Sequence, residues 1–137
     1  MEISWILWYS LPMEKEVVDQ KIREITKKIA QEYQPEKIIL FGSWAWGTPN
    51  EDSDVDLLIV KDSDKPRIER EREVRELLWP PGIAMDIIVY SHHELEKRIN
   101  HDRNLFLEDI VRNGRLIYEK SNNDPLRLTH KPAVLVI

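Results

Sequence analysis

Apolar side chains near the start of the chain recur at helical spacing. Between Glu14 and Gln34 they follow one another at steps of three or four residues, on Val18, Ile22, Ile25, Ile29 and Tyr33. Such a stripe is typical of an amphipathic helix that packs one face on a core. Pro35 then ends the pattern. The spacing therefore predicts a helix over 14–34.

Further along, four apolar runs are too short for helices and are rich in strand-forming residues: 37–41, 54–60, 83–90 and 115–119. Helical patterns separate them. A charged helix is predicted over 67–79, with i,i+4 Glu and Arg pairs on a solvated face. Ser91 and Glu94 form a capping box that opens a helix, and another runs from about Asn104 to Asn113, with Gly114 as its C′ residue. A short helix is also predicted to begin at Ser43.

These elements predict an α+β fold, a short mixed sheet flanked by helices. The 137 residues allow one domain with a single core. We place that domain at 13–120, followed by a C-terminal tail at 121–137. Residues 1–12 precede the helical pattern and the second methionine, Met13, and are interpreted as an arm or an upstream-start artefact.

Composition narrows the classes of function. The net charge is −5, from 25 acidic and 20 basic residues, so a broad grip on a nucleic-acid backbone is not expected. The chain has no cysteine, which excludes disulfides and thiolate metal sites. Its apolar start is too short to span a bilayer and lacks the features of a secretory signal. A cytoplasmic protein is expected.

Two acidic residues stand at the head of a strand that is otherwise apolar. Asp54 and Asp56 alternate with apolar residues, so they share one face with Cα atoms about 6.6 Å apart. A lone Asp86 interrupts the next apolar run, where an unpaired carboxylate is costly. Three carboxylates without His or Cys favour Mg²⁺ or Mn²⁺. The alternative is that Asp54 and Asp56 are turn-capping residues.

The turn between the first two predicted strands indicates a site for an anion. Gly42 permits close approach of a phosphate to the backbone, and Ser43 adds a hydroxyl near a helix N-terminus. Ser43 as a simple N-cap is the alternative, and both roles are compatible. The spacing of Gly42 and Gly47 is that of a P-loop, but Thr48 and Pro49 occupy the positions where Lys and Ser/Thr are required, so that motif is excluded.

The combination of "GS", a "DVD" strand and a later strand with one Asp resembles the minimal nucleotidyltransferases of the DNA polymerase beta superfamily. The resemblance covers about residues 14–120. It implies that Gly42 and Ser43 bind the phosphates of ATP and that Asp54, Asp56 and Asp86 hold Mg²⁺ or Mn²⁺ and carry catalysis. It also implies an antitoxin that transfers AMP to a hydroxyl, expected to be a tyrosine, of a partner HEPN-domain ribonuclease toxin and so inactivates it.

Two alternatives accompany that resemblance: an antitoxin that neutralises the HEPN toxin by binding alone, and the nucleotide-binding subunit of a small-molecule nucleotidyltransferase. One departure bears on them. Similar proteins commonly carry Arg where this chain has Trp44 and Trp46. We interpret both tryptophans as packing residues, with base stacking or a partner interface as the other interpretation for Trp46.

Overall fold

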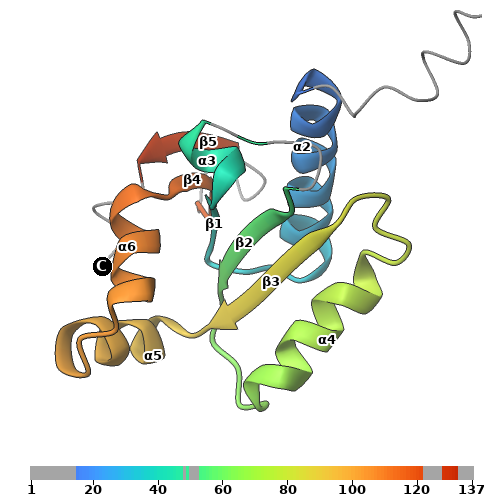
Figure 1. The fold of residues 1–137 in the computed structure, drawn as a ribbon. Helices are drawn as coiled ribbons and strands as arrows, with labels where there is room; N and C mark the ends of the chain where they lie inside the picture. The colour runs from blue at the N-terminus through green and yellow to red at the C-terminus, as the bar shows by residue number, and fades with distance from the viewer. Residues whose placement is uncertain (1–14, 48, 50–52, 122–127, 133–137) are drawn as a thin grey trace, which may run out of the picture.

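A computed structural model describes residues 15–47, 49, 53–121 and 128–132 (Figure 1). Its elements, in chain order, are α2 (Lys15–Glu32), β1 (Lys37–Phe41), α3 (Ser43–Trp46), β2 (Val55–Val60), α4 (Arg67–Leu77), β3 (Met85–Tyr90), α5 (His92–Glu96), the π-helical turn η1 (Lys97–His101), α6 (Leu105–Asn113), β4 (Arg115–Glu119) and β5 (Leu128–Pro132). No helix within the described ranges is long and apolar enough to cross a membrane.

The five strands form one mixed sheet in the order β3-β2-β1-β4-β5. β1 pairs antiparallel with both β2 and β4, β4 pairs antiparallel with β5, and β2 and β3 run parallel. A parallel pair needs a crossover, which α4 supplies. The predicted α+β architecture, a short mixed sheet flanked by helices, is confirmed.

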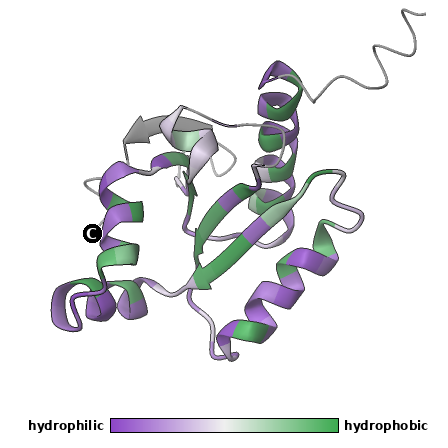
Figure 2. Ribbon diagram, viewed as in Figure 1, coloured by the Kyte–Doolittle hydropathy of each residue, from purple (hydrophilic) through white to green (hydrophobic). Residues whose placement is uncertain are grey.

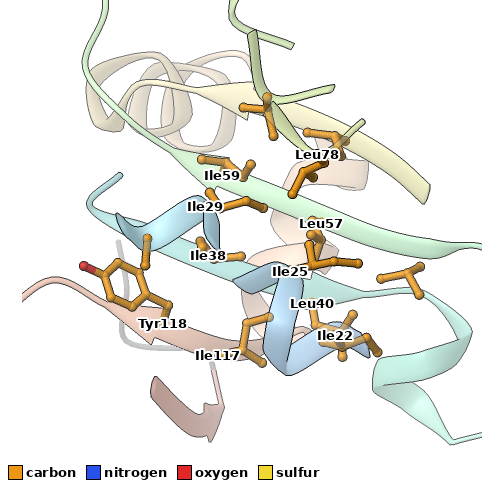
Figure 3. Close-up of a cluster of buried hydrophobic side chains, with 14 of the residues drawn as sticks. Ile22, Ile25, Ile29, Ile38, Leu40, Leu57, Ile59, Leu78, Ile117 and Tyr118 are labelled. Carbon is orange, nitrogen blue, oxygen red and sulfur yellow. The ribbon is translucent and has the colours of Figure 1, made fainter. Parts of the chain in front are cut away.

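Each face of the sheet has its own core. On one face, α2 lays Ile22, Ile25 and Ile29 over strand residues that include Ile38 and Leu57 (Figure 3). On the other face, α5 and α6 pack on the alternate residues of the same strands, among them Ile39, Phe41, Leu58, Val60 and Leu116. Figure 2 shows the apolar residues gathered on the strands and on the sheet-facing sides of the helices, while α4 is largely hydrophilic. The strands are apolar at nearly every position because helices cover both faces.

A buried arginine joins α4 to α5. Arg70 is 7% exposed, and its guanidinium donates to a carboxylate oxygen of Glu94 at 2.5 Å and to the backbone carbonyls of Ser63 and Lys65. Burial works to raise the pKa of Glu94, but hydrogen bonds from Ser91 and Arg70 outweigh it, and the pKa is lowered. The predicted capping box of Ser91 and Glu94 is present, so one carboxylate serves both the cap and the ion pair.

Most predicted elements are present with small shifts in their ends. The first helix ends at Glu32 rather than Gln34, and the strands predicted at 54 and 83 begin at Val55 and Met85. Glu14, residues 1–12 and the last five residues lie outside the described residues.

Two features differ from what the sequence indicated. Gly114 does follow α6, but as its C-cap and not as its C′ residue, and with φ −71° and ψ 173° its backbone is extended. A Cβ there would overlap Ile110 O and lie 2.7 Å from Cγ2 of Ile39, so close packing of α6 on β1 requires the glycine. The second feature is β5, which lies within the predicted tail and was not predicted as a strand.

Candidate active site

The three predicted carboxylates lie at the N-terminal ends of β2 and β3, on one face of the sheet. Asp56 is the second residue of β2, and its Cα partner on the parallel strand β3 is Asp86. Asp54 directly precedes β2. Because side chains alternate along a strand, Asp54 and Asp56 share a face, and residues in register on neighbouring strands point the same way. Leu58 and Val60 continue that alternation into the core under α5 and α6, so this is the α6 face.

Asp56 is the electrostatic centre of this group. Its side chain is partly buried, whereas Asp54 and Asp86 are exposed. Partial burial, followed by the negative charges of Asp86 and Asp54, raises the pKa of Asp56 to about 6. Perturbation by neighbouring like charges is typical of functional carboxylates. A cation or a proton would relieve this repulsion.

Gly42 lies directly against Asp56. Gly42 follows β1 with φ 75°, and Phe41, the residue before it, pairs with Asp56 in the antiparallel register. A Cβ on Gly42 would overlap the carboxylate oxygen Oδ2 of Asp56. Glycine is therefore required at position 42 for two reasons: its φ is positive, and the carboxylate beside it leaves no room for a Cβ. The structure brings the predicted phosphate turn and the predicted metal ligands into contact.

Ser43 is the first residue of α3, and Gly42 occupies the N-cap position without a side-chain capping bond. The interpretation of Ser43 as the N-cap is therefore wrong. The Ser43 hydroxyl makes no capping hydrogen bond. Ser43 directly follows Gly42, the residue that contacts Asp56. The first backbone N–H groups of a helix have no partner within it, so the turn presents donors at the edge that carries the carboxylates.

The two tryptophans of α3 hold it in place. Trp44 packs against the core under α2, and its Nε1 donates to the carbonyl of Ser53 at 3.3 Å. Trp46 is 48% exposed, and its Nε1 donates to the carbonyl of Asn113 at 2.6 Å. Arg115 donates to the carbonyl of Ala45 from β4. Both indoles thus have an anchoring role, and the indole N–H of Trp46 links α3 to α6.

Sequence reasoning missed Arg75. Its guanidinium lies 3.7 Å from Oδ1 of Asp86, with both side chains about half exposed. Arg75 belongs to the alternating charges of α4, which the sequence indicated only as a solvated face. No signal in that pattern distinguishes Arg75 from its neighbours, because the contact depends on α4 lying along β3.

The carboxylates suit an Mg²⁺ ion that is also bound by substrate phosphates. Across the described residues, no three His, Cys, Asp or Glu side chains gather closely enough to hold a metal ion. Mg²⁺ is commonly bound by one or two carboxylates together with substrate phosphates rather than by an all-protein cage. Asp56 with either Asp54, two residues before it, or Asp86, its partner in register, would supply such a carboxylate pair.

A cavity of about 190 Å³ lies elsewhere. It is lined by α2, α3 and β4, with Ile22, Leu40, Trp44 and Ile117 among its apolar walls and Arg23 and Arg115 among its polar ones. Leu40 and Ile117 belong to the core under α2. The cavity is therefore on the opposite face of the sheet from Asp56 and separate from the carboxylates.

Comparison with known proteins decides the family. Residues 21–123 match the family described as "Polymerase beta, Nucleotidyltransferase", and this range includes Gly42, Ser43 and the three aspartates. The chain belongs to the polymerase beta nucleotidyltransferase family. The predicted class of enzyme, a nucleotidyltransferase, is confirmed.

Individual relatives are similar in size as well as sequence. "Putative protein adenylyltransferase MJ0604" of Methanocaldococcus jannaschii is 33% identical over 102 residues, which cover 73% of this chain and 97% of the relative. "Putative protein adenylyltransferase MJ1305" of the same organism is 32% identical over 118 residues, 80% of this chain and 78% of the relative. "Protein adenylyltransferase MntA" of Aphanizomenon flos-aquae is 26% identical over 88 residues, 64% of this chain and 59% of the relative.

The fold also has a counterpart among solved structures. The crystal structure of a "putative nucleotidyltransferase" from Sulfolobus solfataricus is 24% identical to this chain and superposes with a TM-score of 0.53, covering 75% of this chain and 81% of the other. This likeness shows the shared fold.

Proposed function

We propose that this nucleotidyltransferase transfers AMP from ATP, with Mg²⁺ or Mn²⁺, to a hydroxyl of a partner protein. The observation that carries the proposal is the contact between Gly42 and Asp56, with Asp86 in register beside it. It joins donors suited to phosphate with acceptors suited to a divalent cation at one edge of the sheet. Relatives named protein adenylyltransferases support a protein as the acceptor.

Each residue has a role that its position suits. The backbone at Gly42 and the hydroxyl of Ser43 donate hydrogen bonds to phosphate oxygens. Asp54 and Asp56 are the carboxylates that would hold the divalent ion, and Asp86 is the third. Asp86 is also the most exposed member of the in-register pair and lies on the edge strand β3, so it is placed to take the proton of an incoming hydroxyl.

A bound divalent cation would neutralise charge that develops on the phosphates as the acceptor oxygen attacks the α-phosphorus and pyrophosphate leaves. The arrangement of the carboxylates in the protein is suited to binding such a cation. Asp54, Asp56 and Asp86 bring negative charge together, and the pKa of Asp56 is raised first by its partial burial and then by the charges of Asp86 and Asp54.

We further propose that the acceptor is a HEPN-domain ribonuclease toxin, modified on a tyrosine, and that the chain acts as its antitoxin. The support is the resemblance of the "GS" and "DVD" motifs to the minimal nucleotidyltransferases, together with the similarity to the relative named MntA. Between residues 53 and 121 the chain forms α4, α5, η1, α6 and three strands of the one sheet. In this proposal a second polypeptide presents the hydroxyl.

Metal-dependent binding of ATP tests the nucleotide half of this proposal. With ATP at 100 times its dissociation constant and excess Mg²⁺, the native protein should gain about 2.7 kcal/mol of stability, measured by chemical unfolding. The double variant Asp54→Ala, Asp56→Ala should gain nothing, and neither should the native protein with EDTA. Equal stabilisation of the native protein and the double variant would contradict the assigned site.

A further inference from the structure

Phe106 is an exposed aromatic side chain held in a fixed place. It is the second residue of α6 and 60% exposed. Its ring meets the ring of Phe41 edge to face, with centroids 6.0 Å apart and an interplanar angle of 84°. Phe41 itself is only 6% exposed. Phe106 thus contacts a buried partner, while most of its side chain faces solvent.

The register of the sheet places this ring next to the carboxylates. Phe41 is the last residue of β1 and the Cα partner of Asp56. Directly opposed residues of an antiparallel pair lie about 5 Å apart and project on the same face. Asp56 therefore flanks Phe41 on the α6 face. Phe106 contacts the ring of Phe41, so Phe41 has Asp56 as one neighbour and Phe106 as another. Strand pairing brings position 56 beside position 41, and the ring contact brings position 106 to position 41.

α6 makes a second contact at its C-terminal end. The backbone carbonyl of Asn113, the last residue of α6, accepts the indole N–H of Trp46 from α3. The helix that carries Phe106 is therefore attached to the helix that follows Gly42.

We propose that Phe106 is the stacking platform for the base of the nucleotide substrate. This inference rests on the proposed function: if phosphates bind at Gly42 and Asp56, the base, joined to them by a single ribose, must come to rest close by. Among the large exposed apolar side chains of the described residues, Phe106 contacts the neighbour of Asp56 directly. A largely exposed aromatic ring is a surface on which a base can stack.

This placement has a consequence for specificity. Stacking on a phenyl ring depends on the area and polarisability of the base and not on its hydrogen-bonding edge. Phe106 therefore favours purine over pyrimidine nucleotides and contributes little to the choice between adenine and guanine. Selection of ATP over GTP must come from other contacts.

Comparison of ATP with inorganic triphosphate isolates the contribution of the base to binding. The affinity of the protein for each ligand, with Mg²⁺ present, is measured by calorimetric titration. Phe106→Leu keeps an apolar side chain against Phe41 but removes the ring. We expect it to weaken ATP binding about 10-fold to 100-fold and to leave triphosphate binding within about 2-fold. Phe106→Tyr should bind both as the native protein does. Ile68→Ala, an exposed apolar residue on α4, is the control and should change neither.

Each other outcome has a definite meaning. Native-like ATP binding by Phe106→Leu would overturn the inference and leave the proposed function unaffected. If that variant also lost binding to the partner protein, Phe106 would belong to the protein interface. An equal loss of ATP and triphosphate binding would show a structural effect on the phosphate turn and overturn it as well. A native protein that binds neither ligand would contradict the proposed function, and this inference with it.

Discussion

Asp56 is destabilising where it stands, and this property can be measured. Its pKa is about 6 in the folded protein against 3.8 for an ordinary aspartate. A carboxyl whose pKa is raised on folding contributes no penalty below pH 3.8, where both states are protonated. The penalty grows between pH 3.8 and 6 and is complete above pH 6, where the folded protein must hold the charge.

Asp56→Asn should therefore stabilise the metal-free protein at neutral pH. Asn is neutral at every pH and nearly isosteric with Asp. Because Asp56 is only partly buried, we expect a gain of about 1–2 kcal/mol at pH 7.5, below the full value of the shift. At pH 4.5 the gain should be smaller. Urea unfolding in EDTA at both pH values measures it, with exposed Asp64→Asn as the control. A gain that does not change with pH would contradict the electrostatic account.

Gly42 and Gly47 form a matched pair for the turn. Both have positive φ, 75° and 103°, but a Cβ at Gly42 meets Asp56 whereas one at Gly47 meets nothing within 4 Å. Gly42→Ala should lower nucleotidyl transfer by about 100-fold or more, because displacement of about 1 Å at a catalytic group has that effect. Gly47→Ala should lose only about 1 kcal/mol of stability from backbone strain. Comparable activities for the two variants would remove the Gly42–Asp56 contact from the mechanism.

Local spacing predicted where the candidate aspartates lie on the sheet, but it did not predict their contacts. Alternation along a strand was enough to put Asp54 and Asp56 on one face, and a lone Asp86 in an apolar run was enough to single it out. The Gly42–Asp56 contact follows from the antiparallel register of β1 and β2. The Arg75–Asp86 ion pair likewise follows from the packing of α4 along β3. Neither is a property of nearby sequence.

At the scale of elements, Arg70 connects the segment after β2, α4 and α5. Arg70→Ala would leave the carboxylate of Glu94 and two backbone carbonyls without their donor. Breaking a buried ion pair costs about 3–5 kcal/mol, and partial exposure of Glu94 reduces this to about 2–3 kcal/mol. Arg72→Ala, an exposed site on the same helix, should change stability by less than about 0.5 kcal/mol. Chemical unfolding of the two variants compares them, and equal losses would refute the assigned role of Arg70.

The elements that sequence predicted well are those fixed by local pattern. The stripe of α2, the apolar runs of β1 to β4 and the capping box of Ser91 needed no tertiary information. β5 was missed because its sequence, Leu128–Pro132, carries no strand alternation and ends in proline. Only pairing with the edge of β4 makes it a strand. Gly114 is the C-cap of α6 and not the C′ residue that the sequence predicted, and close packing against Ile39 requires glycine there.

At the scale of the whole molecule, the sheet divides the protein into a structural face and a chemical one. α2 covers one face with a continuous apolar core. On the other, α5 and α6 cover the core residues while Asp86 and Phe106 stay exposed at the edge that ends at Gly42. The proposed function has a partner protein bring the acceptor hydroxyl to the exposed Asp86, and this is its central claim.

The most direct measurement is the intact mass of a candidate HEPN partner, encoded beside this chain, after incubation with the protein, ATP and Mg²⁺. The account predicts a mass increase of one or more AMP units, mapped to a tyrosine, that is absent with the Asp54→Ala, Asp56→Ala variant. An unchanged partner mass in a stable complex of the two native proteins would contradict transfer and leave neutralisation by binding.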